Sequence, residues 1–259
     1  MSFIDILALE EATLLVAAVI LAYVGVLGLF AIRRNDAVGV KDSLRSAAIP
    51  VSSIGAIATF FGLWGEMVWQ YPSMGKVGLG YNIFFNDVYL LFGITLLVAG
   101  LSMALSLKLQ YAGLFALVAG GVTISYGYVG YQMGYTSEPL ETLLLYGAFG
   151  LAGVLAMPAT FVVDHFLASP VGTAVPVGIA TPAARRHPSI QASTRAVQPI
   201  IPVDTSGNPD LAAAIRSRLR IPLYVSVPVL VFVVAMALAA VAALLYLDTT
   251  LPKHLASAP

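Results

Sequence analysis

A single carboxylate beside a long apolar stretch is the residue of this chain best placed to do chemistry. Glu66 lies within residues 61–69, FGLWGEMVW. A charged group in or near hydrocarbon is costly, so such a residue is a candidate for function. If Glu66 faces a ligand, it could exchange a proton with it or pair with a cation.

Further polar side chains follow Glu66 along the chain. The segment 81–87 reads YNIFFND, and the apolar stretch 112–133 carries several phenols toward its end. We expect these groups to meet at one end of neighbouring helices and to form a ligand or proton site of Glu66, Tyr81, Asn82, Asn86, Asp87 and Tyr126. Carboxylates with amides suit a hard cation or a quinone head group better than a transition metal.

A plainer interpretation of the same residues stays open. Trp64 and Trp69 are typical of interfacial anchors in an aromatic belt, which any membrane protein has. Asp87 could simply cap the helix that follows it, because an acid complements the helix dipole there. Glu66 could reach water from the membrane interface. Under this interpretation the cluster anchors and caps helices and binds nothing.

The elements that would hold these residues are membrane spans. The chain is 59% hydrophobic and 10% charged, against about 25% charged residues in a soluble domain. A spanning helix needs about 20 mostly apolar residues. Six stretches qualify, which predicts an all-α bundle of six transmembrane helices at residues 12–32, 47–68, 88–107, 112–133, 140–163 and 222–247.

The basic residues predict the orientation of these spans. Eleven of the thirteen Lys and Arg residues fall in the first, third and fifth connections. Cytoplasmic loops are enriched in Lys and Arg, so both termini are expected outside, in a multi-pass protein of the cell (plasma) membrane. Glu66 and Asp87 would then lie at the outer face.

Three regions follow from this map: the five-helix region 1–163, a cytoplasmic loop 164–221, and the sixth span with its tail, 222–259. Residues 169–209 hold seven prolines and few large apolar residues, so an extended or disordered chain is expected. Leu211, Ile215 and Leu219 recur every four residues after Asn208 and Pro209. They predict either a short amphipathic helix at the inner surface or a helical lead-in to the sixth span.

The sequence lacks the residues that several classes of function require. There is no cysteine, and the three histidines lie outside the predicted mid-membrane region, which excludes a bis-histidine haem and thiolate metal sites. The formal net charge is zero, so nothing indicates nucleic acid binding. We expect no metal, no catalytic residue and no cofactor held by this chain's own ligands, although a quinone or a lipid could bind.

Small residues recur at helix-packing distance along several spans. Ala235, Ala239 and Ala243 form one such row in the sixth span. Such rows let helix backbones approach closely in lipid. The row could pack within the chain or face a partner subunit.

The segment 62–87 also carries a family resemblance. Its Gly-x-Trp-Gly-Glu, Trp-Gln-Tyr-Pro and Tyr-Asn-Ile-Phe-Phe-Asn-Asp elements resemble an uncharacterised prokaryotic family of multi-span membrane proteins, the domain of unknown function 981. The likeness covers roughly residues 49–163. It implies a multi-span fold and brings no established activity. It also implies that Glu66, Tyr81, Asn82 and Asp87 belong to the signature of the family.

Three functions are compatible with these features. The first is a non-catalytic subunit of a larger membrane complex, most plausibly energy-transducing or respiratory, in contact with lipids and other membrane subunits. The second is a transporter or binding protein for a small solute or lipid that uses an outer pocket at Glu66 and Asp87. The third is a membrane enzyme acting on a lipid or quinone, which is the weakest because no nucleophile–base pair is visible.

Overall fold

The computed structural model describes residues 6–68, 83–136, 138–169 and 223–257, and all regular structure in these ranges is helical. The elements are α1 (Ile6–Arg33), α2 (Ala37–Val68), the π-helical turn η2 (Ile83–Asp87), α4 (Val88–Ala104), α5 (Gln110–Met133), α6 (Pro139–Ala168) and α8 (Leu223–Ser257). The predicted loop 164–221 lies almost wholly outside the described residues, and so does its predicted amphipathic helix.

Six of these helices are long and apolar enough to cross a membrane, which confirms the predicted all-α six-span bundle. Large apolar side chains are exposed on every long helix, as expected for a surface that contacts lipid tails. Examples are Val19, Phe60, Leu101, Leu114, Leu144 and Leu238. The described part of the chain is therefore built as a membrane protein.

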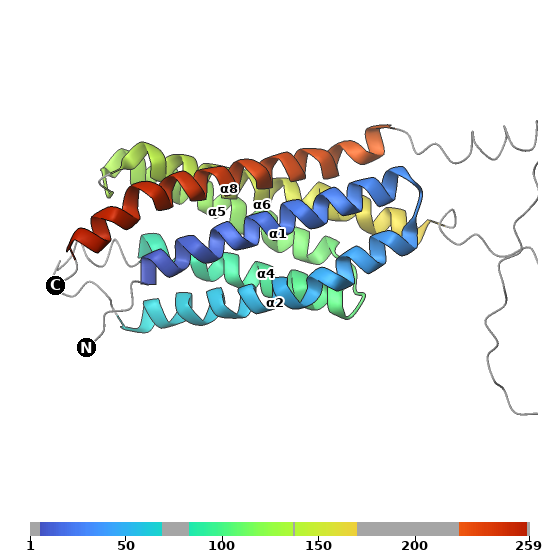
Figure 1. Ribbon diagram of the computed structural model, residues 1–259, viewed down its shortest axis with the longest axis horizontal. Helices are drawn as coiled ribbons and strands as arrows, with labels where there is room; N and C mark the ends of the chain where they lie inside the picture. The colour runs from blue at the N-terminus through green and yellow to red at the C-terminus, as the bar shows by residue number, and fades with distance from the viewer. Residues whose placement is uncertain (1–5, 69–82, 137, 170–222, 258–259) are drawn as a thin grey trace, which may run out of the picture.

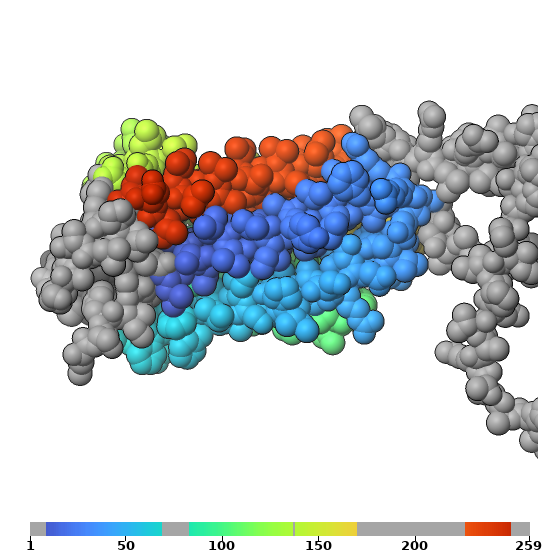
Figure 2. Space-filling model, viewed as in Figure 1, coloured from blue at the N-terminus to red at the C-terminus, as the bar shows by residue number. Residues whose placement is uncertain are grey.

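The long helices form a closed ring. Each helix packs against the next in the order α1, α2, α4, α5, α6, α8, and α8 returns to α1. The contacts are most extensive in the pairs α5 with α6 and α2 with α4, and least extensive between α4 and α5. Figure 1 shows α8, α1 and α2 side by side on one face, and in Figure 2 their side chains meet along that face.

The two ends of the ring differ in charge. Arg33, Arg34, Lys41, Arg45 and Lys108 gather at one end, which we call the basic end. The start of α1 and the end of α8 lie at the other end, which we call the acidic end because Glu10, Glu11, Glu66, Asp87 and Glu141 lie there. The even number of spans agrees with both termini lying on one side. Which side of the membrane that is stays a prediction.

The alanine row of α8 packs inside the chain. Ala235, Ala239 and Ala243 are buried and share a core cluster with Ala18 and Ala152. Of the two predicted alternatives for this row, packing within the chain is therefore confirmed, because α1 and α6 already contact it.

Glycines allow the two most extensive pairs to approach closely. In the pair α2 with α4, Gly55 and Gly62 of α2 lie against the α4 backbone at Leu97 and Leu90. Gly93 and Gly100 of α4 lie against the α2 backbone at Thr59 and Ser52, and the two glycines of each helix are seven residues apart. A Cβ atom on Gly62 would lie 2.8 Å from the Leu90 backbone nitrogen. This spacing keeps the glycines on one face of each helix, so the backbones touch where a larger residue would separate them.

Acidic side chains cap the starts of α2 and α5, and both helices begin earlier than expected. The Asp36 Oδ1 atom accepts a hydrogen bond from the Gly39 amide at 2.8 Å, so α2 begins ten residues before its predicted start and contains Lys41 and Arg45. Helix α6 continues to Ala168, past the boundary set at residue 163. Its Asp164 carboxylate accepts the amides of Leu109 at 3.0 Å and Gln110 at 2.8 Å and so caps α5.

Candidate functional site

Three of the predicted site residues come together at the acidic end. The Tyr126 hydroxyl of α5 donates a hydrogen bond to Asp87 Oδ2 at 2.8 Å. The Glu66 carboxyl group, near the end of α2, lies in direct interaction range of the Asp87 carboxyl group. Its other oxygen, Oε1, is buried and has no hydrogen-bond partner within the described ranges. Asp87 thus joins α2, η2 and α5.

The turn that carries Asp87 is fixed by stacked aromatic rings. Phe84 is 3% exposed, and its ring stacks on Tyr146 with the centroids 4.8 Å apart. The Tyr146 hydroxyl donates a hydrogen bond to the Phe84 carbonyl oxygen at 2.9 Å, which satisfies a backbone acceptor of the turn. Asn86 is buried in the same turn. Residues 83–87, expected as part of a loop, are therefore a packed π-helical turn continuous with α4.

Two details concern the plainer interpretation, in which these residues cap and anchor helices. The Asp87 side chain makes no capping hydrogen bond to α4, and its backbone is helical, with φ −57° and ψ −48°. Its carboxylate accepts a hydrogen bond from Tyr126 instead, and the role of Asp87 as an acid that complements the dipole of α4 stays a prediction. Trp64 is 48% exposed beside Phe60, as an interfacial anchor requires. Tyr81, Asn82 and Trp69 lie outside the described residues.

Removing the Tyr126 hydroxyl should destabilise the bundle, because a hydrogen bond to a charged group contributes about 1.5–3 kcal/mol. We expect Tyr126→Phe and Asp87→Asn each to lower the unfolding free energy, and the double variant to lose less than their sum. Tyr128→Phe is the matched control, because Tyr128 is 57% exposed. Unfolding in detergent compares the four variants with the wild type, and strictly additive losses would contradict the contact.

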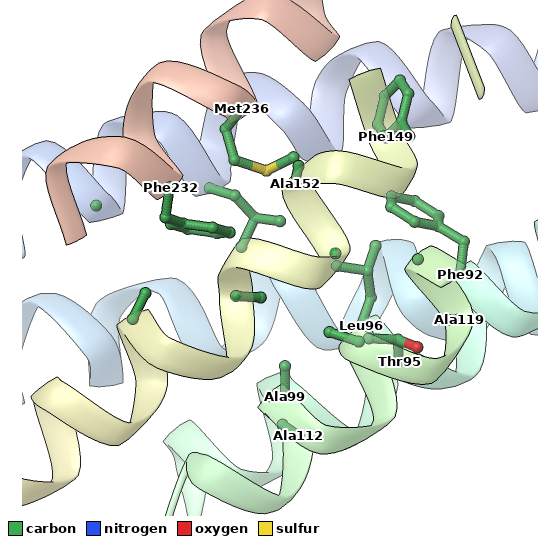
Figure 3. A pocket seen from close by; sticks show the side chains of 18 of the residues that line it. Phe92, Thr95, Leu96, Ala99, Ala112, Ala119, Phe149, Ala152, Phe232 and Met236 are labelled. Atoms are coloured by element: carbon green, nitrogen blue, oxygen red, sulfur yellow. The ribbon is translucent and has the colours of Figure 1, made fainter. Parts of the chain in front are cut away.

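A cavity runs along the axis of the ring. Its volume is about 200 Å³, and all six long helices contribute side chains to its wall. Figure 3 shows the middle of this space, where Phe92 and Leu96 of α4 face Phe149 and Ala152 of α6, with Phe232 of α8 nearby. The wall here is almost entirely apolar. Sequence periodicity did not predict this cavity, because it arises only when six helices close a ring.

The acidic end of this central cavity carries two acids that sequence reasoning treated only as flanking charges. Glu10 and Glu11 are 5% and 4% exposed, and both line the cavity. Tyr89 also lines it, with its hydroxyl 2.6 Å from the Thr13 hydroxyl. The first span was expected to begin at Ala12, but α1 begins at Ile6 and takes both acids into the bundle.

A signal for these acids is present in the sequence. Steps of seven residues from Glu10 reach Ala17, Val24 and Ala31, and all four residues are buried. The same steps from Glu11 reach Ala18, Gly25 and Ile32. Two heptad rows of mostly small residues that end in acids therefore mark the face of α1 that turns inward.

The described residues include few groupings of side chains that could coordinate a metal ion. No group of three His, Asp or Glu residues that could hold a metal ion is found there. The cavity wall instead offers aromatic and aliphatic side chains along most of its length.

The fold and the cavity together define a polytopic α-helical membrane protein with a ligand-sized space among its six spans. The chain belongs to the family described as Protein of unknown function (DUF981), whose model matches residues 1–181. This match is wider than the expected 49–163: it includes α1 with both cavity acids and leaves α8 outside. No curated protein and no solved structure matches the chain.

Proposed function

We propose that this protein binds a small apolar or amphiphilic molecule from the lipid phase in its central cavity. The observation that carries the proposal is the cavity itself. Protein interiors are close-packed and hold few voids larger than a water molecule. An engineered apolar cavity of about 150 Å³ in another protein binds benzene. A cavity of about 200 Å³ is therefore large enough for a ring or an alkyl chain.

The wall of the cavity supports an apolar ligand. Phe92 and Phe149 make an edge-to-face contact with their centroids 5.6 Å apart, and both rings line the space. Met236 adds an adaptable thioether from α8. Binding pockets for small molecules are typically apolar with a few polar groups that set orientation. A quinone ring or a lipid chain belongs to the ligand class that such a wall accepts.

The cluster of Glu66, Asp87 and Tyr126 supports this function by position. It holds η2 against α2 and α5, and the residues that follow Asp87 line the cavity, among them Val88 and Tyr89. The sequence placed the binding site of a transporter in an outer pocket at Glu66 and Asp87. We now place it in the central cavity of the ring. A proton-exchanging role for Glu66 stays a prediction.

The hypothesis of a non-catalytic subunit of an energy-transducing or respiratory complex also stays a prediction. The alanine row of α8 no longer supports this hypothesis, because it packs against α1 and α6 of the same chain and is not free for a partner subunit. A subunit that holds a quinone or lipid for a neighbour would use the same cavity, so the two hypotheses differ in partners rather than in the binding space.

Native mass spectrometry tests the proposal on the full chain extracted gently from its own membrane. We expect one small molecule per protein that survives washing with detergent, since a ligand held among six helices leaves more slowly than the annular lipid shell. Extraction of the released molecule identifies its class. A protein that carries only exchangeable annular lipid would contradict the proposal.

A further inference from the structure

One end of the central cavity is chemically different from the rest of its wall. Glu10 and Glu11 line it there, nine-tenths or more buried, and Glu10 Oε1 has no hydrogen-bond partner in the described ranges. A buried carboxyl oxygen without a partner costs free energy, because nothing replaces the water it has lost. Because Glu10 belongs to the cavity wall, a partner that enters the cavity could reach this carboxyl group.

Neighbouring polar groups do not supply that partner. The Tyr89 and Thr13 hydroxyls are 2.6 Å apart, and the Thr13 hydroxyl also lies within hydrogen-bond distance of the carbonyl oxygens of Leu9 and Glu10. The two acids are also adjacent in the chain, so their like charges repel if both are ionised. A positive charge in the cavity would offset both costs at once, whereas a neutral acceptor such as a carbonyl would offset neither.

We propose that the acidic end of the central cavity receives a cationic head group, so that the ligand is an amphiphile with an amine at one end and an apolar body. This rests on the proposed function and names its ligand class. Glu10 and Glu11 pair with the ammonium group. The rings of Phe85, Phe92 and Phe149 line the adjacent wall and contact the body. Aromatic faces near a cation add to its attraction.

A lysine of the same chain is the competing source of positive charge. Lys76 and Lys253 belong to the acidic end by sequence, and their side chains lie outside the described residues. If one of them occupied the head-group position, an added amine would gain nothing over an alcohol until that lysine was removed. The variants Lys76→Gln and Lys253→Gln separate this case from the proposal.

Three probes of equal chain length test the proposal: decylamine, decanol and decanoate. The full chain is placed in phosphatidylcholine nanodiscs, and its thermal midpoint is followed as each probe is added, since a ligand of the native state stabilises it. Leu14→Trp, which enlarges a cavity-lining side chain one turn from Glu10, gives the background from partitioning into the bilayer. We expect decylamine to bind about tenfold or more tightly than decanol, and decanoate to bind most weakly.

Glu10→Gln should lower decylamine binding by about tenfold and change decanol binding by less than about twofold, because it keeps the shape and removes the charge. Glu11→Gln gives a second test in case the first variant folds poorly. Glu141→Gln is the control: this acid lies at the same end, accepts a hydrogen bond from Thr249 at 2.6 Å and does not line the cavity.

Each outcome separates this inference from the proposed function. If the three probes bind the wild type equally, the head-group inference is wrong and the apolar cavity site stands. If amine selectivity appears only in a lysine variant, the chain supplies its own cation and the inference is again wrong. If no probe shifts the wild type more than Leu14→Trp, the proposed function fails as well.

Discussion

Gly120→Leu should prevent the bundle from folding stably, while Gly121→Leu, one residue further along α5, should be close to neutral. A Cβ atom on Gly120 would lie 2.5 Å from the Gly150 carbonyl oxygen and 2.8 Å from the Val154 amide nitrogen of α6. A Cβ atom on Gly121 would meet nothing within 4 Å. Both variants replace glycine by leucine, which is a better helix former, so they differ only in where the new side chain points.

The expected loss at Gly120 is large because the obstacle is backbone. A side chain can rotate away, but the α6 backbone can yield only by moving the helix, and α5 with α6 is the most extensive contact of the ring. Overpacking costs about 1–3 kcal/mol where side chains can adjust, so we expect about 3 kcal/mol or more here. Folded yield on size exclusion and the thermal midpoint measure it. Equal behaviour of the two variants would refute the packing of α5 on α6.

Gly28→Leu should empty the cavity of its ligand and yet leave the protein folded. Gly28 lines the cavity, and a Cβ atom there would meet nothing within 4 Å. The isobutyl group of leucine would therefore enter the open space without displacing a helix. We expect the amount of tightly bound small molecule to fall at least about tenfold, which corresponds to about 1.4 kcal/mol of binding free energy.

The same substitution should make the ligand-free protein more stable, by about 0.5–2 kcal/mol, because filling a cavity adds contacts. Loss of ligand together with a gain in stability is a combination that general damage to the fold cannot produce. Gly121→Leu serves again as the matched control, since its new side chain faces outward. Retention of the ligand in Gly28→Leu would place the ligand elsewhere on the protein.

Much of the architecture could be predicted from the sequence because lipid imposes a strong rule. Long apolar stretches give the spans directly, and the six predicted stretches correspond to the six long helices. The ends were less accurate, since polar caps such as Asp36 and Asp164 extend helices beyond the apolar stretch.

The candidate site was predicted only in part. The meeting of Glu66, Asp87 and Tyr126 followed from topology, because all three sit at the same end of consecutive spans. The central cavity could not be predicted, since it depends on which face of each helix turns inward. Glu10 and Glu11 were missed because acids before an apolar stretch resemble an exposed flank, whereas their heptad rows turn them into the bundle.

An experimental density map of the protein in nanodiscs of its own membrane lipids would show whether the central cavity holds a ligand. We expect density that does not belong to the chain along the axis of the ring, beside Phe92, Phe149 and Phe232, with one end at Glu10. A bundle whose helices close on one another and leave no space there for a ligand would contradict this expectation.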